Sequence, residues 1–351
     1  MPFYNKHNSK DLKARMAQSH EKRTTISFYQ YYQLADPESF RNDLYLAWDQ
    51  LGVLGRVYVA HEGINAQISV PTSQFPLFQA HLNSISWLQG IRLNIAVEDD
   101  GKSFFKLVIK VRPKILADGL NDQTFDVTNK GKHLSADEFN QLTSQENTVL
   151  IDMRNHYEHE VGHFKGAIRP DVDTFRDSLP VVEEILEEHR HKNIVMYCTG
   201  GIRCEKASAW FKHRGFDHVF QLEGGIIKYA HDIQEKGLEN RFIGKNFVFD
   251  ERLGERISDE VIAHCHQCGA PCDSHTNCAN TMCNLLFIQC EACNEAYEAC
   301  CSNECKDTTH LPEEVQAEMR KGTDSGVRIY SKGRLKESVK PEELSEDRMS
   351  S

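Results

Sequence analysis

An apolar strand pattern that runs into a cysteine-containing turn constrains the fold of this chain more than any other segment. Residues 193–198 read Asn-Ile-Val-Met-Tyr-Cys, which is typical of a strand buried on both faces of a sheet. A turn with two glycines follows, and residues 205–215 have the pattern of a helix that ends at a glycine. A buried strand, a tight turn and a helix in this order predict a parallel sheet covered by helices.

The same alternation continues on both sides of this segment. Residues 148–154 have the pattern of another strand, residues 176–190 that of an amphipathic acidic helix, and residues 218–226 that of a short strand and turn. We therefore predict an α/β domain with a parallel sheet over residues 146–240. In such sheets, sites form beyond the carboxyl ends of strands, and Cys198 lies at one of these ends.

A different order of patterns precedes this domain. Strands are predicted over residues 26–34 and 55–70 (two strands joined at 62–65), a hairpin over 91–113 with its turn at 99–101, and helices over 37–52 and 73–85. The order β-α-β-β-α-β is that of a ferredoxin-like sandwich, which we assign to residues 24–117. Residues 118–145 are assigned to a linker, and residues 1–23 to a polar arm with six basic and two acidic residues.

Basic and apolar side chains alternate along the last predicted strand of this unit. The basic face comprises Lys106, Lys110, Arg112 and Lys114, and the apolar face comprises Phe105, Leu107, Ile109 and Val111. Two interpretations remain open: a charged edge strand that resists aggregation, or a surface that contacts the phosphate backbone of RNA. The net charge of −11 argues weakly against a bulk nucleic-acid coat, whereas the basic arm at residues 1–23 favours the RNA interpretation.

The turn that begins at Cys198 has the residues needed to stabilise a thiolate. It ends at a helix N-terminus, where free amides and the helix dipole favour an anion. Gly200 and Gly201 allow amides to turn inward, and Arg203 adds a permanent cation. Four residues separate the cysteine from the arginine, one fewer than in cysteine phosphatases, so the loop suits a sulfur atom better than a phosphate. The alternative is a buried, unreactive cysteine at a strand end. The next cysteine, Cys204, is either a second redox-active thiol or a packing residue.

Ten of the twelve cysteines lie between residues 265 and 305. No apolar run reaches the length of a membrane span and residues 1–23 do not resemble a secretory signal, so we expect a cytoplasmic, reducing location. There, clustered cysteines indicate metal or thiol chemistry. Two Cys-x-x-Cys pairs, Cys265 with Cys268 and Cys290 with Cys293, predict a structural zinc site.

Other uses of this segment remain open. A second site is possible among the remaining cysteines: Cys272, Cys278, Cys283, and one or more of Cys300, Cys301 and Cys305. Disulfides formed on isolation and a redox-active or iron–sulfur role are the alternatives. We assign residues 241–310 to this Cys-rich segment and residues 311–351 to a charged tail with a basic run at 328–336.

Motifs spread along the chain resemble one bacterial family. The central ones are Asp152-Met153-Arg154, Glu158, Gly-His-Phe-Lys-Gly-Ala at 162–167, the loop at 198–203 and Leu-Glu-Gly-Gly at 222–225. Gly55-Arg56 and Glu-Gly-Ile-Asn at 62–65 precede them, and the run from Cys265 to His275 follows. Over residues 25–310 this string resembles the rhodanese-domain, oxygen-dependent tRNA uridine hydroxylase family.

The resemblance implies an activity that the residues alone do not. It implies hydroxylation of the wobble uridine of tRNA, position 34, to 5-hydroxyuridine, with molecular oxygen as co-substrate. No organic cofactor is inferred, because the residues do not resemble a haem, flavin or two-His-one-carboxylate iron site. It implies that Cys198 is the nucleophile, that Arg203 and the loop amides hold its sulfur, and that Asp152 and Arg154 brace the site. The expected partner is tRNA, with no membrane or DNA partner; the oligomeric state is not predicted.

Two other functions remain from the loop and the domain pattern. The loop alone indicates a sulfurtransferase that carries a persulfide on Cys198. A nonenzymatic RNA-binding adaptor is the third hypothesis, and the presence of both Cys198 and Arg203 argues against it.

Overall fold

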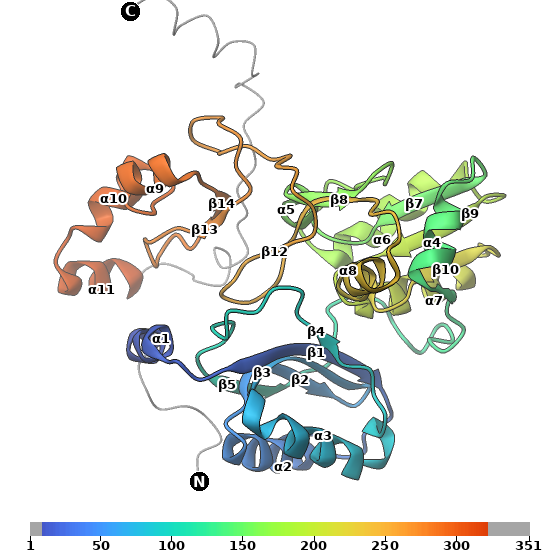
Figure 1. Ribbon diagram of the computed structural model, residues 1–351, viewed down its shortest axis with the longest axis horizontal. Coiled ribbons are helices and arrows are strands. Elements are labelled where there is room, and N and C mark those ends of the chain that lie inside the picture. Colours follow the sequence, from blue (N-terminus) through green and yellow to red (C-terminus); the bar gives the residue numbers. More distant parts are fainter. Residues whose placement is uncertain (1–8, 322–351) are drawn as a thin grey trace, which may run out of the picture. The chain divides into compact units, whose positions relative to one another are not determined.

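The computed structural model describes residues 9–321 (Figure 1). These residues form two compact units. The first unit contains the described residues up to Arg154, together with Gly166–Arg241 and Val248–Glu255. The second contains Asn155–Lys165, Phe242–Phe247 and the described residues from Arg256 onward. Within residues 9–321, no helix combines the length and apolar character needed to cross a bilayer.

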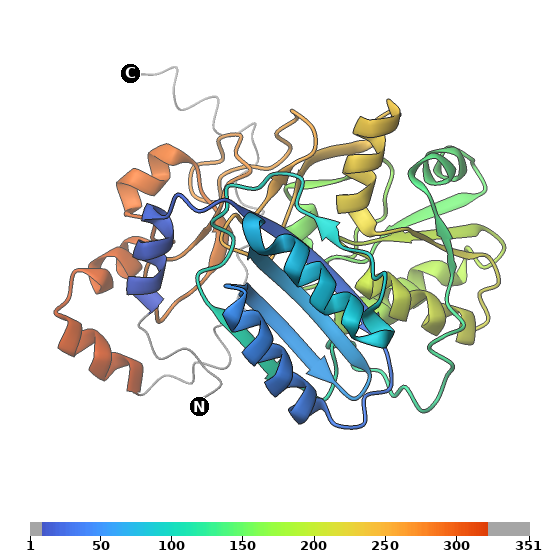
Figure 2. The ribbon, with the colours of Figure 1, turned by 60° about the horizontal axis from the view of Figure 1, so that its bottom comes forward.

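The first half of unit one is a five-stranded sheet with helices on one face (Figure 2). Its elements are β1 (Arg23–Tyr31), α2 (Pro37–Gln50), β2 (Leu54–Ala60), β3 (Gly63–Pro71), α3 (Phe75–Ser84), β4 (Asn94–Ile95) and β5 (Leu107–Val111). The sheet order is β4-β1-β3-β2-β5, so the predicted ferredoxin-like fold is confirmed, with β5 added at one edge. A short helix, α1 (Ser9–Gln18), precedes it within the predicted arm.

Alternation along the strands decides which face of this sheet is buried. Ile26 and Phe28 of β1 pack with Trp48 of α2 in the core beneath the helices. Helix α2 begins after Asp36, whose carboxylate accepts a hydrogen bond from the Ser39 amide at 3.0 Å. The opposite, helix-free face therefore carries the polar members of each strand.

The predicted hairpin over residues 91–113 is wrong. β4 pairs antiparallel with β1, whereas β5 pairs parallel with β2 at the other edge of the sheet. Alternating apolar residues suit either edge equally, so the sequence pattern did not fix the partner. Asp99 does form a local turn, accepting a hydrogen bond from the Gly101 amide at 2.9 Å, but it also accepts one from the Thr25 hydroxyl at 3.1 Å. The β2–β3 turn is tighter than predicted, since Ala60 pairs directly with Gly63.

The second half of unit one contains a four-stranded parallel sheet in the order β6-β10-β9-β7. Its strands are β6 (Lys132–Leu134), β7 (Thr148–Asp152), β9 (Asn193–Tyr197) and β10 (Val219–Leu222). Its helices are α4 (Ala136–Thr143), α6 (Phe175–Glu187), α7 (Ile202–His213) and α8 (Gly225–Lys236). The predicted parallel α/β architecture is confirmed.

The expected linker over residues 118–145 needs correction. It contains β6, an edge strand of the parallel sheet, and α4, which begins with a capping box made by Ser135 and Glu138. A strand of three residues carries too little alternation to be recognised from the sequence.

The second unit is built from short elements. They are α5 (His156–His159), β8 (Gly162–Phe164), β11 (Phe242–Asn246), β13 (His275–Asn277), β14 (Leu286–Ile288), α9 (Glu291–Tyr297), α10 (Asn303–Thr309) and α11 (Glu313–Lys321), and β12 (Glu255–Arg256) joins it to unit one. β12, β11 and β8 form one sheet, and β13 pairs with β14. The expected tail begins with α11, and its basic run at 328–336 lies outside the described residues.

Candidate functional site

Cys198 follows β9 directly and lies at the start of the turn into α7. Its sulfur accepts a hydrogen bond from the Gly201 amide, with 3.2 Å between nitrogen and Sγ. The residue is 1% exposed. The loop therefore closes around the sulfur, with the first amides of α7 directed toward it.

Two glycines are required by this geometry. Gly201 has φ = +100°, and a Cβ there would lie 2.9 Å from the Tyr29 hydroxyl oxygen. Gly225, the first residue of α8, has φ = +66°, and its Cβ would lie 2.5 Å from the carbonyl oxygens of both Cys198 and Thr199. The role of Gly201 agrees with the sequence prediction that a glycine here lets the loop amides turn inward. The packing of Gly225 against the loop was not foreseen, although Gly225 belongs to the motif at 222–225.

The surroundings of Cys198 favour its thiolate. Burial alone raises the pKa of Cys198, but a hydrogen bond from Cys204, the Arg203 charge and the amides of Cys204 and Arg203 lower it to about 6. Burial and the neighbouring Cys198 raise the pKa of Cys204 well above its ordinary value. Cys198 is thus the anion and Cys204 its hydrogen-bond donor, buried in the same apolar cluster.

Arg203 spans the mouth of the loop. Its Nη2 donates to the Thr199 hydroxyl oxygen at 3.4 Å, and its guanidinium lies 5.9 Å from the centre of the Phe249 ring. The residue is 7% exposed. A cation held this way lowers the free energy of negative charge on the loop without blocking the loop amides.

Asp152 and Arg154 form a fully buried ion pair beside the loop. Arg154 Nη2 lies 2.6 Å from Asp152 Oδ2, and the Tyr197 hydroxyl donates to the same oxygen at 2.6 Å. Tyr197 is the residue before Cys198. The contacts support a positioning role, in which the pair fixes the end of β9.

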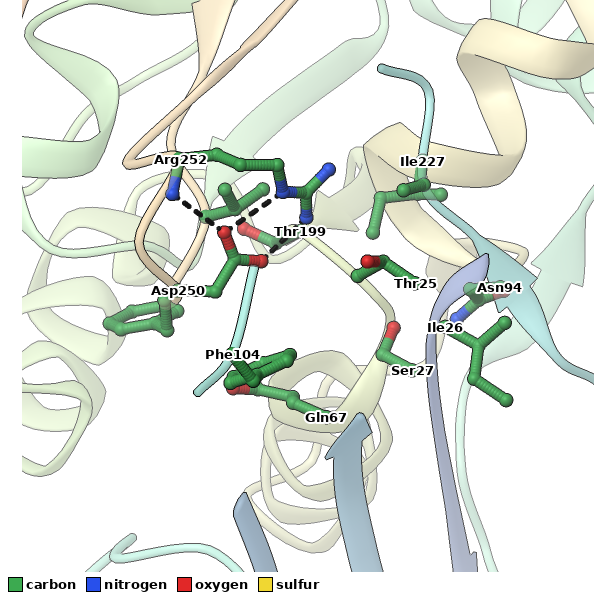
Figure 3. Close-up of a pocket in the computed structure, with 13 residues that line it drawn as sticks. Thr25, Ile26, Ser27, Gln67, Asn94, Phe104, Thr199, Ile227, Asp250 and Arg252 are labelled. Atoms are coloured by element: carbon green, nitrogen blue, oxygen red, sulfur yellow. Dashed lines mark hydrogen bonds and ion pairs between the residues drawn. The ribbon is translucent and has the colours of Figure 1, made fainter. Parts of the chain in front are cut away.

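A pocket lies beside this loop and is partly open to solvent, with about 380 Å³ of empty space including the open part (Figure 3). Its lining comprises Thr25, Ile26, Ser27, Gln67, Asn94, Ala96, Phe104, Thr199, Ile227, Val248, Phe249, Asp250 and Arg252. Thr199 of the loop lines the pocket, whereas Cys198 does not. Asn94 Nδ2 donates to the Gly200 carbonyl oxygen at 3.3 Å, so the pocket wall and the loop are joined.

The ferredoxin-like sheet contributes residues to this pocket that no sequence pattern had indicated. Thr25 and Ser27 alternate with the buried Ile26 along β1 and lie on the helix-free face. That alternation is visible in the sequence and shows which residues leave the core, but not what they face. Tyr29 continues the row and donates to Glu205 Oε1 of α7 at 3.2 Å.

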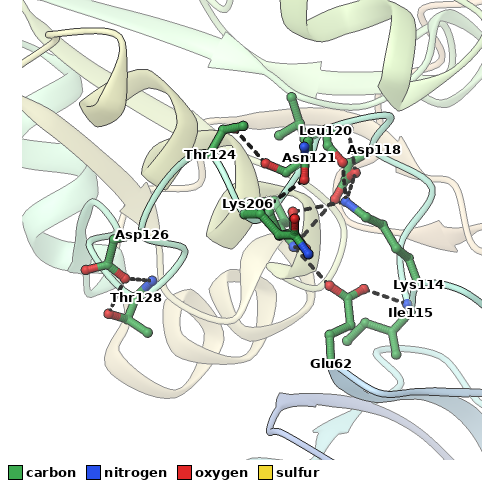
Figure 4. Close-up of polar contacts among 12 residues, drawn as sticks. Glu62, Lys114, Ile115, Asp118, Leu120, Asn121, Thr124, Asp126, Thr128 and Lys206 are labelled. Atoms are coloured by element: carbon green, nitrogen blue, oxygen red, sulfur yellow. Dashed lines mark hydrogen bonds and ion pairs between the residues drawn. The ribbon is translucent and has the colours of Figure 1, made fainter.

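The basic residues proposed for RNA contact do not behave as one set. Lys114 lies beyond the end of β5, where its ammonium contacts Asp118 at 2.7 Å and Asp122 at 3.0 Å (Figure 4). The buried Lys206 joins the same cluster, 3.0 Å from Glu62. Lys114 therefore takes part in an ion-pair network with Asp118 and Asp122, and its contact with RNA stays a prediction.

The remaining basic residues lie near the exposed edge strand. Lys110 is exposed on β5, and its register partner on β2 is Tyr58. Arg56, also exposed, lies two residues earlier on β2. Lys106 and Arg112 flank β5; Lys106 is partly exposed and Arg112 is exposed. These residues place positive charge beside an aromatic ring on the helix-free face.

Eight cysteines of the second unit form two groups. Within each group the four sulfur atoms lie within 4.8 Å of one another: Cys265, Cys268, Cys290 and Cys293 in the first, and Cys278, Cys283, Cys301 and Cys305 in the second. The first is the predicted set. Cys272 and Cys300 belong to neither, and all twelve cysteines are free thiols. Either group has the donors to bind a metal.

Three families match consecutive parts of the chain. The family described as a UPF0176 acylphosphatase-like domain matches residues 23–115, the rhodanese-like domain matches residues 135–232, and the family described as rhodanase C-terminal matches residues 243–306. A solved rhodanese-like domain from Anabaena sp. aligns with 32% of this chain and 78% of its own at 20% identity and a TM-score of 0.26.

Whole-length relatives extend these matches. The tRNA uridine(34) hydroxylase of Pectobacterium carotovorum is 57% identical over 333 residues, covering 95% of this chain and 94% of the relative. The protein of the same name from Photorhabdus laumondii is 55% identical and covers 95% of both chains, and that from Salmonella heidelberg is 57% identical over the same shares. This chain belongs to the tRNA uridine(34) hydroxylase family.

Proposed function

We propose that this protein hydroxylates uridine 34 of tRNA at C5, forming 5-hydroxyuridine with molecular oxygen as co-substrate. The observation that carries the proposal is the Cys198 thiolate, with a pKa of about 6, in a loop that borders a pocket shared with the ferredoxin-like sheet. The names of the family's members give the reaction and the nucleotide. Because the substrate is tRNA, we place the reaction in the cytoplasm.

The pocket suits a nucleobase. Ser27, Gln67 and Asn94 supply hydroxyl and amide groups that match the donors and acceptors of a uracil edge, and apolar side chains line the rest. A base in the single-stranded anticodon loop leaves its stack at small cost.

In the proposed reaction, the Cys198 sulfur bonds to C6 of the base. Cys198 does not line the pocket itself, so this step requires the loop to turn the sulfur toward the side of Thr199. The electrons of the C5–C6 double bond then make C5 nucleophilic, and C5 bonds to one oxygen atom of O₂. The other oxygen leaves as water, with two electrons and two protons from two equivalents of a thiol reductant, which become a disulfide. Loss of the C5 proton and of the Cys198 thiolate restores the double bond.

Docking of the tRNA is assigned to the helix-free face of the ferredoxin-like sheet. This face carries Ser27 and Gln67 at the pocket and Arg56, Tyr58 and Lys110 toward the β5 edge. Basic side chains neutralise phosphates, and an aromatic ring on a sheet surface stacks on unpaired bases. Lys106 and Arg112 extend the same charge along the edge.

A double variant of Lys110 and Arg112, compared with a variant of Lys114, tests this docking surface. We expect Lys110→Ala with Arg112→Ala to weaken tRNA binding about 3- to 30-fold and to flatten its salt dependence, because two phosphate contacts are lost. Lys114→Ala should leave the salt dependence unchanged and lower the stability of the fold, since Asp118 then loses its close partner. Binding measured by fluorescence anisotropy at several salt concentrations separates the two. Equal salt dependence in the double variant and the wild type would move the contact elsewhere.

A structural zinc ion is proposed for the first cysteine group. The sulfurs of Cys268 and Cys290 are 3.6 Å apart, a spacing that fits two thiolates on one tetrahedral ion. Cys265 and Cys293 would complete the set. Bound zinc would supply folding free energy to a segment with little apolar core.

Sulfur transfer remains the second candidate, because the same loop would hold a persulfide on Cys198. Its specific support is the match of the rhodanese-like domain to residues 135–232. A sulfurtransferase forms thiocyanate from thiosulfate and cyanide, and its activity needs no tRNA. Rapid thiocyanate formation without hydroxylation of tRNA would favour it.

Replacement of Cys198 tests the proposed function directly. In cells that produce only Cys198→Ser or Cys198→Ala, we expect 5-hydroxyuridine and nucleosides derived from it to fall below detection in tRNA digests analysed by mass spectrometry. Cys272→Ser is the matched control, because Cys272 lies outside the loop and outside both cysteine groups. Undiminished 5-hydroxyuridine in the Cys198 variants would remove Cys198 from the mechanism.

A further inference from the structure

The two cysteine groups of the second unit use alternating pairs along the chain. The pair Cys265 and Cys268 and the later pair Cys290 and Cys293 form the first group. Cys278 and Cys283 lie between these pairs, and Cys301 and Cys305 follow them, yet these four form the second group. Pairs one and three therefore meet at one point, and pairs two and four meet at another.

The second group has the spacing of metal ligands. Sγ of Cys283 is 3.7 Å from Sγ of Cys301, which is in turn 3.7 Å from Sγ of Cys305. A disulfide would require about 2.05 Å. Zinc–sulfur bonds of about 2.3 Å in a tetrahedron separate the sulfurs by about 3.8 Å. The observed distances match the edge of that tetrahedron.

The four sulfurs of the second group come from two segments of the chain. Cys278 and Cys283 lie in the connection between β13 and β14. Cys305 lies in the first turn of α10, where the Ser302 hydroxyl caps its amide at 3.2 Å. Asn280 Nδ2 donates to the Cys305 sulfur at 3.4 Å, a contact of the kind that orients a metal-bound thiolate.

The core around this group is too small to explain its order. Its buried members are Cys278, Phe287 and Cys300, and the partly buried residues packed on them are Leu285 and three further cysteines. A cluster in which most members are cysteines buries little apolar surface. A bound ion supplies the missing stabilisation in segments of this kind.

Two glutamine side chains, the buried Gln289 and the partly buried Gln267, connect the two groups. Gln267, within the first Cys-x-x-Cys pair, donates to the Cys300 carbonyl oxygen at 3.1 Å. Gln289 Nε2 contacts Gln267 Oε1 at 2.8 Å and the same Cys300 oxygen at 3.2 Å. Cys300 precedes Cys301 of the second group. These hydrogen bonds join the first Cys-x-x-Cys pair to the backbone beside the second group.

We propose that Cys278, Cys283, Cys301 and Cys305 bind a second zinc ion, and that the alternating pairs make the segment a cross-braced module with two zinc ions. Each ion joins two cysteine pairs, and the chain between these two pairs contains a pair that binds the other ion. Loss of either ion therefore loosens both sites. This inference is independent of the hydroxylation of tRNA.

Metal analysis of the full-length protein, prepared without chelators, tests the proposal. We expect two zinc ions per chain in the wild type, a result that requires no variant to fold. One zinc per chain would overturn the second site, and iron in place of zinc would overturn the choice of metal. Substitution with cobalt should give the visible absorption of two tetrathiolate sites.

Paired variants test the coupling. Cys278→Ser with Cys301→Ser should hold one zinc, and a chelator should remove this zinc at least tenfold faster than it removes zinc from the wild type. Cys265→Ser with Cys290→Ser should also hold one zinc, at the second site, and a chelator should likewise remove it at least tenfold faster than zinc from the wild type. Cys272→Ser should retain two zinc ions with unchanged release. Two zinc ions in the Cys278/Cys301 variant, or unchanged release of the remaining ion, would contradict the cross-brace.

Discussion

The cysteine of the α7 turn and the cysteines of the second unit are the same side chain in opposite surroundings. The Cys198 sulfur is surrounded by N–H donors and the Arg203 cation, which stabilise a single anion. The sulfurs of Cys283 and Cys301 have another sulfur 3.7 Å away. Four thiolates this close repel one another unless a cation lies between them. The first arrangement suits a nucleophile, and the second suits a set of metal ligands.

The same contrast exists inside the loop. Cys198 and Cys204 are both buried, yet the pKa of one falls to about 6 and that of the other rises. Burial has the same sign for both thiols. The difference arises because the donors converge on Cys198, and Cys204 is one of those donors. Burial alone therefore does not tell which cysteine of a pair is reactive.

Replacement of Cys204 is expected to have the largest effect on the pKa of Cys198, and so on the difference between the two thiols. Cys204→Ala removes the hydrogen bond that most lowers the pKa of Cys198, so that pKa should rise toward its ordinary range near 8.5. Reactivity depends on the thiolate and is lost as the pH falls through the pKa. The wild type should therefore react with iodoacetamide with a midpoint at pH of about 6, and the variant with a higher midpoint and slower reaction at pH 7.

Two matched variants divide this effect between its causes. Cys204→Ser keeps a hydroxyl donor and should stay close to the wild-type midpoint. Arg203→Ala removes the charge but keeps the Cys204 donor, and its midpoint should rise by less than that of Cys204→Ala. If Cys204→Ala reacts with the wild-type pH profile, Cys204 is a packing residue only.

Local chemistry explains why the sequence sufficed for the loop. Cys198, Gly201 and Arg203 act within six positions of one turn, and their spacing already indicates an anion site. The hydroxylation reaction came from the family resemblance, which the whole-length relatives support. Nothing in the residue pattern of the loop indicates oxygen chemistry rather than sulfur transfer.

Long-range pairing explains what the sequence did not show. β5 pairs with β2 instead of returning beside β4, and an alternating pattern is silent about its partner. Lys114 followed the alternation in the sequence, but the strand ends at Val111 and the chain turns toward Asp118. The pocket joins Ser27 to Thr199 across distant parts of the chain, so no local pattern records it.

The smallest effect on the reactivity of Cys198 is expected when a chelator removes metal from the two cysteine groups. The groups that set the Cys198 pKa are Cys204, Arg203 and loop amides, all within the turn, so chelation should leave the midpoint of its reaction with iodoacetamide unchanged. The same treatment should lower the thermal unfolding temperature, because binding free energy is folding free energy at structural zinc sites. Peptide mass mapping separates alkylation of Cys198 from that of the newly exposed metal ligands. A shift of the Cys198 midpoint together with the loss of zinc would show that the two uses of cysteine are coupled, and would replace the local account of the thiolate with one that spans both units.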